Sequence, residues 1–390
     1  MMNNLLQFTT LEIVMMIALL LPFVIQLVYH FNLYRGISRH CHDEQVGNLP
    51  YQKEYLPISV IVIARDDADD LERFLPSVLE QDYPDFEVIV VNDGATDECN
   101  DLLKRLEVKY GNLYHTFTPN DARHVCYMKL AVTVGIKAAK HEWLVFTEPN
   151  CHPVSNQWLR LMARNFTDST DVVLGYSTFH HGEAMWQHKA KYYNFFNQLR
   201  YLSFALKDKT YMGCGRNLAY RKSVFFNNKG FSSHLNLNAG HDDIFVNEVA
   251  TPFNTRVELN LESVVMMEAY ENERSWREER SNYRSTCRLY KGKQRFLLGF
   301  ETCMRILFLL FAFCVIIYSA IVQQWVVLGF AALLYILYYV FHIIIFDGAA
   351  AVLGEPKHYL SYLRRDFQQL FVSIKERIIY SSTEKSEYDR

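Results

Sequence analysis

No charged side chain lies between Arg305 and Asp347, so residues 306–346 form one long and mostly apolar run. A single helix of about 40 residues would extend roughly 60 Å, which is about twice the ~30 Å thickness of the hydrocarbon core of a bilayer. Two helices of opposite direction fit this run better, and the polar stretch at residues 323–325 is the place to turn. The sequence therefore predicts a transmembrane helical hairpin over residues 301–347.

A second apolar segment lies near the N-terminus, from about Thr10 to His30, with Glu12 at its edge. This segment is too long for the core of a signal peptide, and no small-residue cleavage site follows it. We therefore interpret residues 1–34 as an uncleaved transmembrane anchor.

Basic residues gather on one side of all three predicted spans. They follow the N-terminal span, precede the hairpin and follow it: Arg35, Arg39, Lys291, Lys293, Arg295, Arg305, Arg364, Arg365, Lys375 and Arg377. The positive-inside rule then places the N-terminus outside and the rest of the soluble chain in the cytoplasm. Residues 348–390 are expected to be a cytoplasmic tail with an amphipathic helix on inner-leaflet lipids at about 359–379. Packing of that helix against the soluble domain would give the same pattern.

The overall charge and the cysteines exclude other classes. The chain has 40 Lys and Arg against 43 Asp and Glu, a net charge of −3, so we expect no nucleic-acid partner. None of the eight cysteines forms a CxxC pair, which argues against a zinc ribbon or a disulfide framework. A reducing compartment that faces the cytosol suits this cysteine usage.

The middle of the chain, residues 50–300, alternates predicted strands and helices. Residues 58–63, 86–91 and 143–147 are continuous apolar runs typical of buried parallel strands, and residues 174–178 are a weaker candidate. Polar or acidic turns follow these strands. This pattern predicts an open, mostly parallel α/β sheet, which binds ligands at the carboxyl ends of its strands.

Five segments in this region resemble the family 2 glycosyltransferases with a GT-A fold. They are PISVIVIARD at 57–66, QDYP at 81–84, VNDGATD at 91–97, GCGRNLAYRK at 213–222 and GHDDIFVN at 240–247. The resemblance covers about residues 50–300, and the flanking spans match the membrane-bound bacterial members. It implies a Rossmann-like, mostly parallel sheet. It also implies inverting transfer of a sugar from a nucleotide-diphosphate donor, usually uridine-based, to a hydroxyl group.

The resemblance assigns a nucleotide site and a catalytic carboxylate. Asp93 at a strand end would accept from the uracil edge, with Asp66 or Arg65 beside the ring or ribose, although residues 92–94 also suit a simple turn. An inverting transferase needs one carboxylate as general base for the acceptor hydroxyl. Asp242 is the first candidate and Asp243 the second, although an aspartate here would also cap a helix.

Two motifs depart from the family pattern. The metal-binding Asp-x-Asp falls at residues 148–150, where Glu148 can ligate Mg²⁺ or Mn²⁺ but Asn150 offers only a neutral oxygen. The Gln-x-x-Arg-Trp motif aligns on residues 279–283, so that Tyr283 keeps only the aromatic face. We expect Arg280 or Arg284 to meet the diphosphate instead, with help from Lys129.

These features predict a non-processive enzyme of the bacterial inner (cytoplasmic) membrane, with its catalytic domain in the cytoplasm. Its acceptor would be a lipid-linked sugar or a glycan in envelope polysaccharide or glycolipid synthesis. The aromatic and basic segment at 186–196 suits the lipid headgroup zone, or equally an ordinary packed helix. Two rival readings remain: a catalytically degenerate relative that acts as a binding or scaffold subunit, and an unrelated membrane protein whose cytosolic domain senses a ligand.

Overall fold

The computed structural model describes residues 8–357 apart from 95–96, 119–125, 181 and 236, together with residues 359, 362, 364 and 368. The chain divides into two compact units, one made of Met1–Arg35 with Phe296–Arg390 and the other of Gly36–Arg295. The predicted amphipathic helix at 359–379 falls largely outside the described residues.

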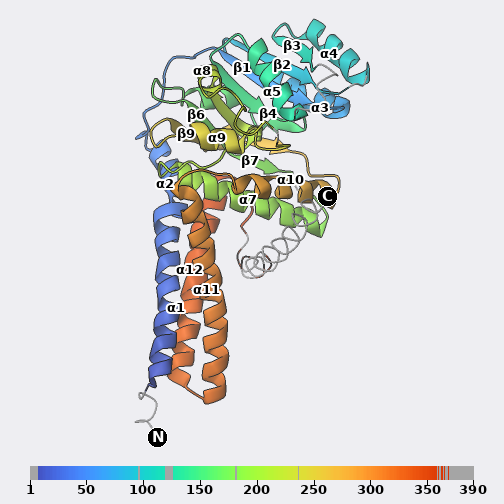
Figure 1. The fold of residues 1–390 in the computed structure, drawn as a ribbon. Helices are drawn as coiled ribbons and strands as arrows, with labels where there is room; N and C mark the ends of the chain where they lie inside the picture. The colour runs from blue at the N-terminus through green and yellow to red at the C-terminus, as the bar shows by residue number, and fades with distance from the viewer. Residues whose placement is uncertain are drawn as a thin grey trace. The chain divides into compact units, whose positions relative to one another are not determined.

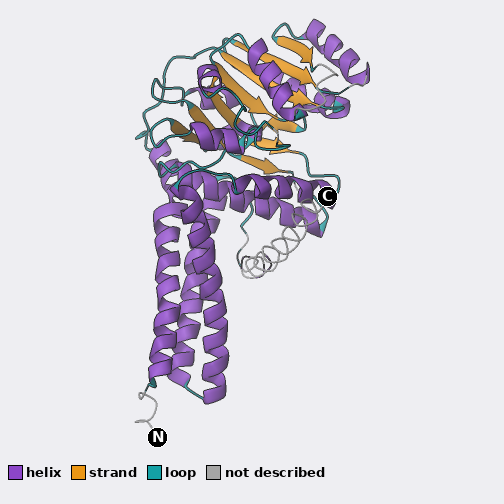
Figure 2. Cartoon of the chain, in the orientation of Figure 1, coloured by secondary structure: helices purple, strands orange, loops and turns teal. Residues whose placement is uncertain are grey.

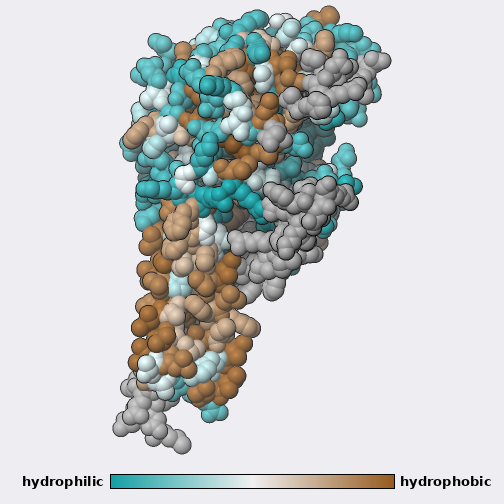
Figure 3. Space-filling view, in the orientation of Figure 1, coloured by the Kyte–Doolittle hydropathy of each residue, from teal (hydrophilic) through white to brown (hydrophobic). Residues whose placement is uncertain are grey.

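The first unit is a bundle of long apolar helices, α1 (Thr10–Tyr29), α11 (Lys293–Val322) and α12 (Trp325–Val352). In the described residues, three helices are long and apolar enough to cross a membrane. The first of them is continuous from Thr10 to Gln45, because α1 runs through the π-helix η2 (His30–Tyr34) into α2 (Arg35–Gln45). Apolar side chains cover most of the bundle on the face that Figure 3 shows. The chain turns between α11 and α12 at Gln323, whose φ is +60°.

The second unit is built on one large twisted sheet (Figure 1). Within the described part of the chain, seven strands form this sheet in the order β3-β2-β1-β4-β8-β6-β9. Their bounds are β1 Ile58–Ala64, β2 Phe86–Asn92, β3 Leu113–Phe117, β4 Trp143–Thr147, β6 Val172–Gly175, β8 Leu218–Arg221 and β9 Thr255–Glu258. Strands β3, β2, β1 and β4 are parallel, and β8 runs antiparallel between β4 and β6. The predicted mostly parallel α/β fold with one N-terminal and two C-terminal apolar helices is therefore confirmed.

Helices pack against the strands of this sheet (Figure 2). They are α3 (Ala68–Leu79), α4 (Asp97–Lys109), α5 (Tyr127–Ala138), α6 (Trp158–Ala163), α8 (Lys222–Asn227) and α9 (Asp243–Val249). The central strands are buried along nearly their whole length, because Val and Ile pack well on both faces of a covered sheet. This core positions the strand ends that carry polar residues.

A smaller sheet stands beside the first, with the order β5 (Cys151–Pro153), β10 (Val265–Met267) and β7 (Ser177–Phe179). The predicted strand at 174–178 is in fact divided, since β6 belongs to the large sheet and β7 to the small one. The division is stabilised by Asn217, whose amide donates to the carbonyl of Tyr176 at 2.8 Å. A side chain at Gly175 would collide with Asn217, because a Cβ there would lie 2.3 Å from its Cγ.

Two long helices complete the unit, α7 (Met185–Ala205) and α10 (Glu273–Cys287). The segment at 186–196 lies in α7, and its aromatic side chains Tyr192, Phe195 and Phe196 are buried. Of the two interpretations of this segment, the burial favours a packed helix.

Candidate active site

The carboxylate of Asp242 is held by three hydrogen bonds at the start of α9. Its Oδ2 accepts from the backbone N–H of Gly215 at 3.0 Å and from the hydroxyl of Tyr283 at 2.7 Å. Its Oδ1 accepts from the N–H of Asp243 at 2.8 Å, so the residue is also the N-cap of α9. Burial raises the pKa of Asp242, but His241 and these hydrogen bonds outweigh it and leave the pKa below the usual range. The group is therefore ionised at neutral pH, as a general base must be.

Asp243 faces a different environment from Asp242. Its side chain is fully buried and accepts from the hydroxyl groups of Thr286 and Tyr290, the latter at 2.6 Å. Burial and the neighbouring charge of Asp242 raise the pKa of Asp243 to about 7. Asp243, the second candidate base, therefore links α9 to the end of α10.

The raised pKa of Asp243 predicts a pH-dependent stability. Between about pH 4, the pKa expected in the unfolded chain, and pH 7 the folded protein keeps a proton that the unfolded chain has lost. The free energy of unfolding should therefore fall over this range, by on the order of a few kcal/mol from this group. Thermal unfolding of the detergent-solubilised protein at pH 5 and pH 7 measures the slope. Asp243→Asn should flatten it and the exposed Asp101→Asn should not; equal slopes in all three proteins would contradict the assignment.

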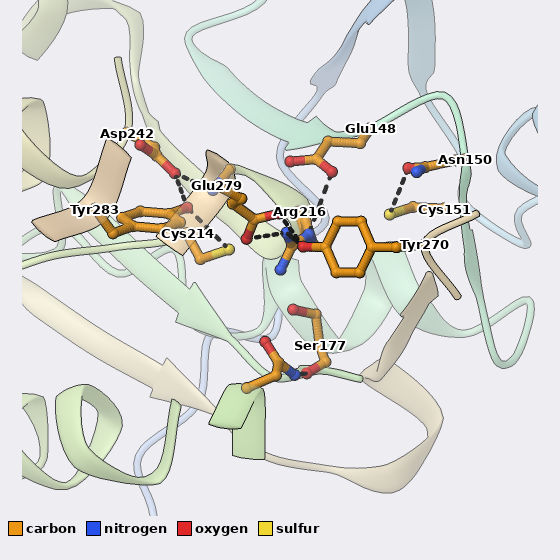
Figure 4. A network of polar contacts seen from close by, with 12 residues as sticks. Glu148, Asn150, Cys151, Ser177, Cys214, Arg216, Asp242, Tyr270, Glu279 and Tyr283 are labelled. Atoms are coloured by element: carbon orange, nitrogen blue, oxygen red, sulfur yellow. Dashed lines mark hydrogen bonds and ion pairs between the residues drawn. The ribbon is translucent and has the colours of Figure 1, made fainter. Parts of the chain in front are cut away.

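Arg216 forms the centre of a second polar group (Figure 4). It lies in the short helix η3 (Gly215–Asn217) with only 3% of its surface exposed. Its Nε lies 3.2 Å from Oε2 of Glu148, and its Nη2 lies 2.5 Å from Oε1 of Glu279. Tyr270 contacts the same Nη2 at 3.3 Å and donates its hydroxyl to Glu279. Because Gly215 binds Asp242 and Arg216 binds Glu148, adjacent residues of η3 connect the two groups.

The position of the family's metal motif does not suit a cation. Glu148 is paired with the Arg216 guanidinium, and the neutral Oδ1 of Asn150 faces the Cys151 thiol at 3.6 Å. Mg²⁺ beside phosphates is usually held by one or two free carboxylates together with waters and the phosphates themselves. No group of three or more His, Cys, Asp or Glu residues that could hold a metal occurs among the described residues. The residues present therefore do not fit a resident divalent cation.

The residues predicted for the nucleotide lie together at the ends of β1 and β2. Asp93 follows β2, with its Oδ1 accepting from Thr118 at 2.5 Å and its N–H donating to the carbonyl of Ala64 at 2.7 Å. Asp66 adopts a positive φ of 59° close to Gly94, where a Cβ would lie 2.4 Å from its Oδ1. The guanidinium of Arg65 lies 5.1 Å from the ring centre of Tyr127. The close approach at Gly94 thus brings the polar ends of the two strands side by side.

The cations expected at the diphosphate have protein contacts of their own, and their role there stays a prediction. Lys129 is buried and donates to the backbone carbonyls of His234 and Leu237, the latter at 2.9 Å. These hydrogen bonds stabilise the backbone at His234 and Leu237. Arg280 lies over the rings of Tyr193 and Trp276, at 4.4 and 4.9 Å. The backbone carbonyl of Arg284 accepts from the Cys287 thiol at 3.0 Å. Of the residues expected from α10, Tyr283 contacts Asp242.

Sequence reasoning missed the residue that joins these groups. Arg216 lies inside the GCGRNLAYRK segment, and Glu279 lies at the first position of the altered Gln-x-x-Arg-Trp motif. The available signal was the combination of an arginine in a glycine-rich segment with an unexpected extra carboxylate in α10.

Comparison with known proteins assigns the family. Residues 59–226, from β1 to α8, match the sequence model of glycosyl transferase family 2. The chain contains a glycosyltransferase family 2 domain. The predicted family is therefore confirmed for this domain, and the match supports the predicted class of enzyme, a glycosyltransferase.

The individual relatives of this chain are distant. Glycosyltransferase AglE of Haloferax volcanii is 29% identical over 104 residues, which cover 26% of this chain and 33% of AglE. The alignment thus spans about a third of that relative. Mannosyltransferase PcManGT from Pyrobaculum calidifontis, solved with GDP-Man and Mn²⁺, matches 85% of this chain and 97% of its own with a TM-score of 0.53 and 15% identity. TarS residues 1–349 from S. aureus, solved with UDP-GlcNAc, covers 56% of this chain and 60% of its own with a TM-score of 0.37 and 19% identity.

Proposed function

We propose that the protein transfers one sugar at a time, with inversion, from a nucleotide-diphosphate donor to a hydroxyl of a membrane-associated acceptor. The observation that carries this proposal is the ionised carboxylate of Asp242, held by Gly215 and Tyr283 beside the Arg216 group. PcManGT was solved with a nucleotide sugar, which supports a donor of that class. A uridine diphosphate sugar is the first candidate.

The chemistry follows from the position of Asp242. Its carboxylate accepts the proton of the acceptor hydroxyl while the hydroxyl oxygen attacks the anomeric carbon of the donor. The bond between that carbon and the diphosphate oxygen breaks with its electron pair going to the diphosphate, and the configuration inverts. Asp93, Asp66 and Arg65 would hold the nucleotide at the ends of β1 and β2. A resident Mg²⁺ or Mn²⁺ has no step in this scheme, because the donor set at Glu148 and Asn150 does not fit it.

The proposed acceptor is a lipid-linked sugar or glycan at the inner leaflet, used to build envelope polysaccharide or glycolipid. The long apolar helices support a membrane location. The basic residues beside them support a cytoplasmic face for residues 36–295, in a bacterial inner membrane. A catalytically inactive binding or scaffold subunit is the alternative, which the two substituted motifs favour.

A panel of nucleotide sugars tests the proposal. The full-length protein in detergent is incubated with UDP-, GDP- and other nucleotide sugars and a lipid extract, and release of the nucleoside diphosphate is measured. We expect one donor to turn over well above the rest, because a buried polar site rejects donors that leave its groups unpaired. Binding of a nucleotide without release from any donor would favour the inactive subunit.

A further inference from the structure

The guanidinium of Arg216 is clamped between two carboxylates that differ in how they are held. Only 4% of the Arg216 side chain is exposed, against 38% for Glu148 and 30% for Glu279. Figure 4 shows both carboxylates reaching the guanidinium from different elements, Glu148 after β4 and Glu279 from α10. A buried, permanently charged group is thus covered by two partly exposed anions.

This arrangement is unfavourable for a diphosphate as it stands. Two carboxylates and one guanidinium carry a net negative charge, and like charges repel an incoming anion at short range. This guanidinium is paired with Glu148, at the position where the family's donor diphosphate is expected. For a diphosphate to bind there, one carboxylate must leave Arg216.

The contacts indicate that Glu279 is the carboxylate that leaves. It binds the terminal Nη2, which an arginine offers to a phosphate in a two-pronged contact, whereas Glu148 binds the inner Nε. Glu279 also has a second partner, because the Tyr270 hydroxyl donates to its other oxygen. On leaving Arg216 it keeps that hydrogen bond, which lowers the cost of the move.

We propose that the donor diphosphate binds Arg216 by displacing Glu279, and that this guanidinium supplies the positive charge for which the family uses a divalent cation. The inference rests on the proposed function, because it concerns the same donor. Arg216 then stabilises the negative charge that develops on the diphosphate as the sugar leaves. Glu279 is a competing counter-ion that keeps the guanidinium neutralised in the absence of donor.

Isothermal titration of the full-length protein in detergent with uridine diphosphate and guanosine diphosphate, in EDTA, tests this proposal. We expect Glu279→Gln to bind its preferred diphosphate about tenfold more tightly than wild type, which corresponds to about 1.4 kcal/mol. Arg216→Lys should bind at least tenfold more weakly, because it keeps a charge but loses the fork. In the double variant, Glu279→Gln should no longer tighten binding. The matched control is Glu273→Gln, which removes the same charge from α10 at a site paired with Arg277.

The results separate this inference from the proposed function. If Glu279→Gln binds the diphosphate in EDTA no more tightly than wild type, the inference is overturned. It is also overturned if wild type binds the diphosphate only with Mn²⁺ and Glu279→Gln loses that binding, because Glu279 would then be a metal ligand. If a donor turns over in the panel assay while either result is found, the proposed function stands and only the role of Arg216 falls. No binding by any variant overturns the inference, and a silent panel besides would overturn the proposed function.

Discussion

Asp242→Asn is expected to lower the rate of sugar transfer by about 10²–10⁴-fold while leaving donor binding nearly unchanged, since a general base contributes on that scale. The amide keeps the shape of the side chain but cannot accept the proton of the acceptor hydroxyl. Its oxygen can still receive the N–H of Gly215 and the hydroxyl of Tyr283. Transfer rates under saturating donor and acceptor, with diphosphate affinity measured separately, check this result.

Two variants show whether the loss comes from the base itself. Tyr283→Phe removes a hydrogen bond that favours the ionised carboxylate, so the pKa of Asp242 should rise and the acidic limb of the rate profile should move to higher pH. Asp101→Asn, an exposed change on α4, should leave rate and profile as in wild type. Transfer that persists at the wild-type rate in Asp242→Asn would remove this residue from the mechanism.

The sequence was sufficient for the three parallel strands β1, β2 and β4 because the evidence for them is local. Continuous runs of Val and Ile can be buried only between two layers, and each of the three strongest runs became a parallel strand. The strand ends followed, since parallel strands place their carboxyl ends at one edge. Asp93, Asp66 and Arg65 are therefore gathered as expected, although their roles stay predictions.

The partners of charged groups could not be predicted in this way. Arg216 and Glu279 are 63 residues apart in the chain, and only the packing of α10 brings them together. The role of Lys129 at the phosphates stays a prediction, but the sequence could not show that two carbonyls of a distant loop accept its hydrogen bonds. Helical spacing likewise could not show that the ring of Tyr193 would hold Arg280. Charge pairing is a property of the folded contacts, not of the local pattern.

The second large effect is expected on stability, from Arg164→Met. Arg164 follows α6 and makes a two-pronged contact with Glu258 at the end of β9, at 2.6 and 2.7 Å, and a further contact with Glu44 at 2.7 Å. Glu258 is only 1% exposed. Removal of the arginine leaves this carboxylate buried without its ion-pair partner, and breaking such a pair destabilises by about 3–5 kcal/mol. For a chain of this size we expect a fall in Tm on the order of 10 °C.

The double variant Arg164→Met/Glu258→Met distinguishes an unpaired buried charge from a loss of packing. Since the penalty comes mainly from the stranded carboxylate, the double variant should recover a large part of the lost Tm. Arg105→Met, which breaks the exposed contact with Glu72 at 3.5 Å, is the matched control and should change the free energy of unfolding by about 1 kcal/mol or less. A double variant no more stable than Arg164→Met would mean that the arginine acts through its contact with the Tyr51 ring, 4.1 Å away, and not through its charge.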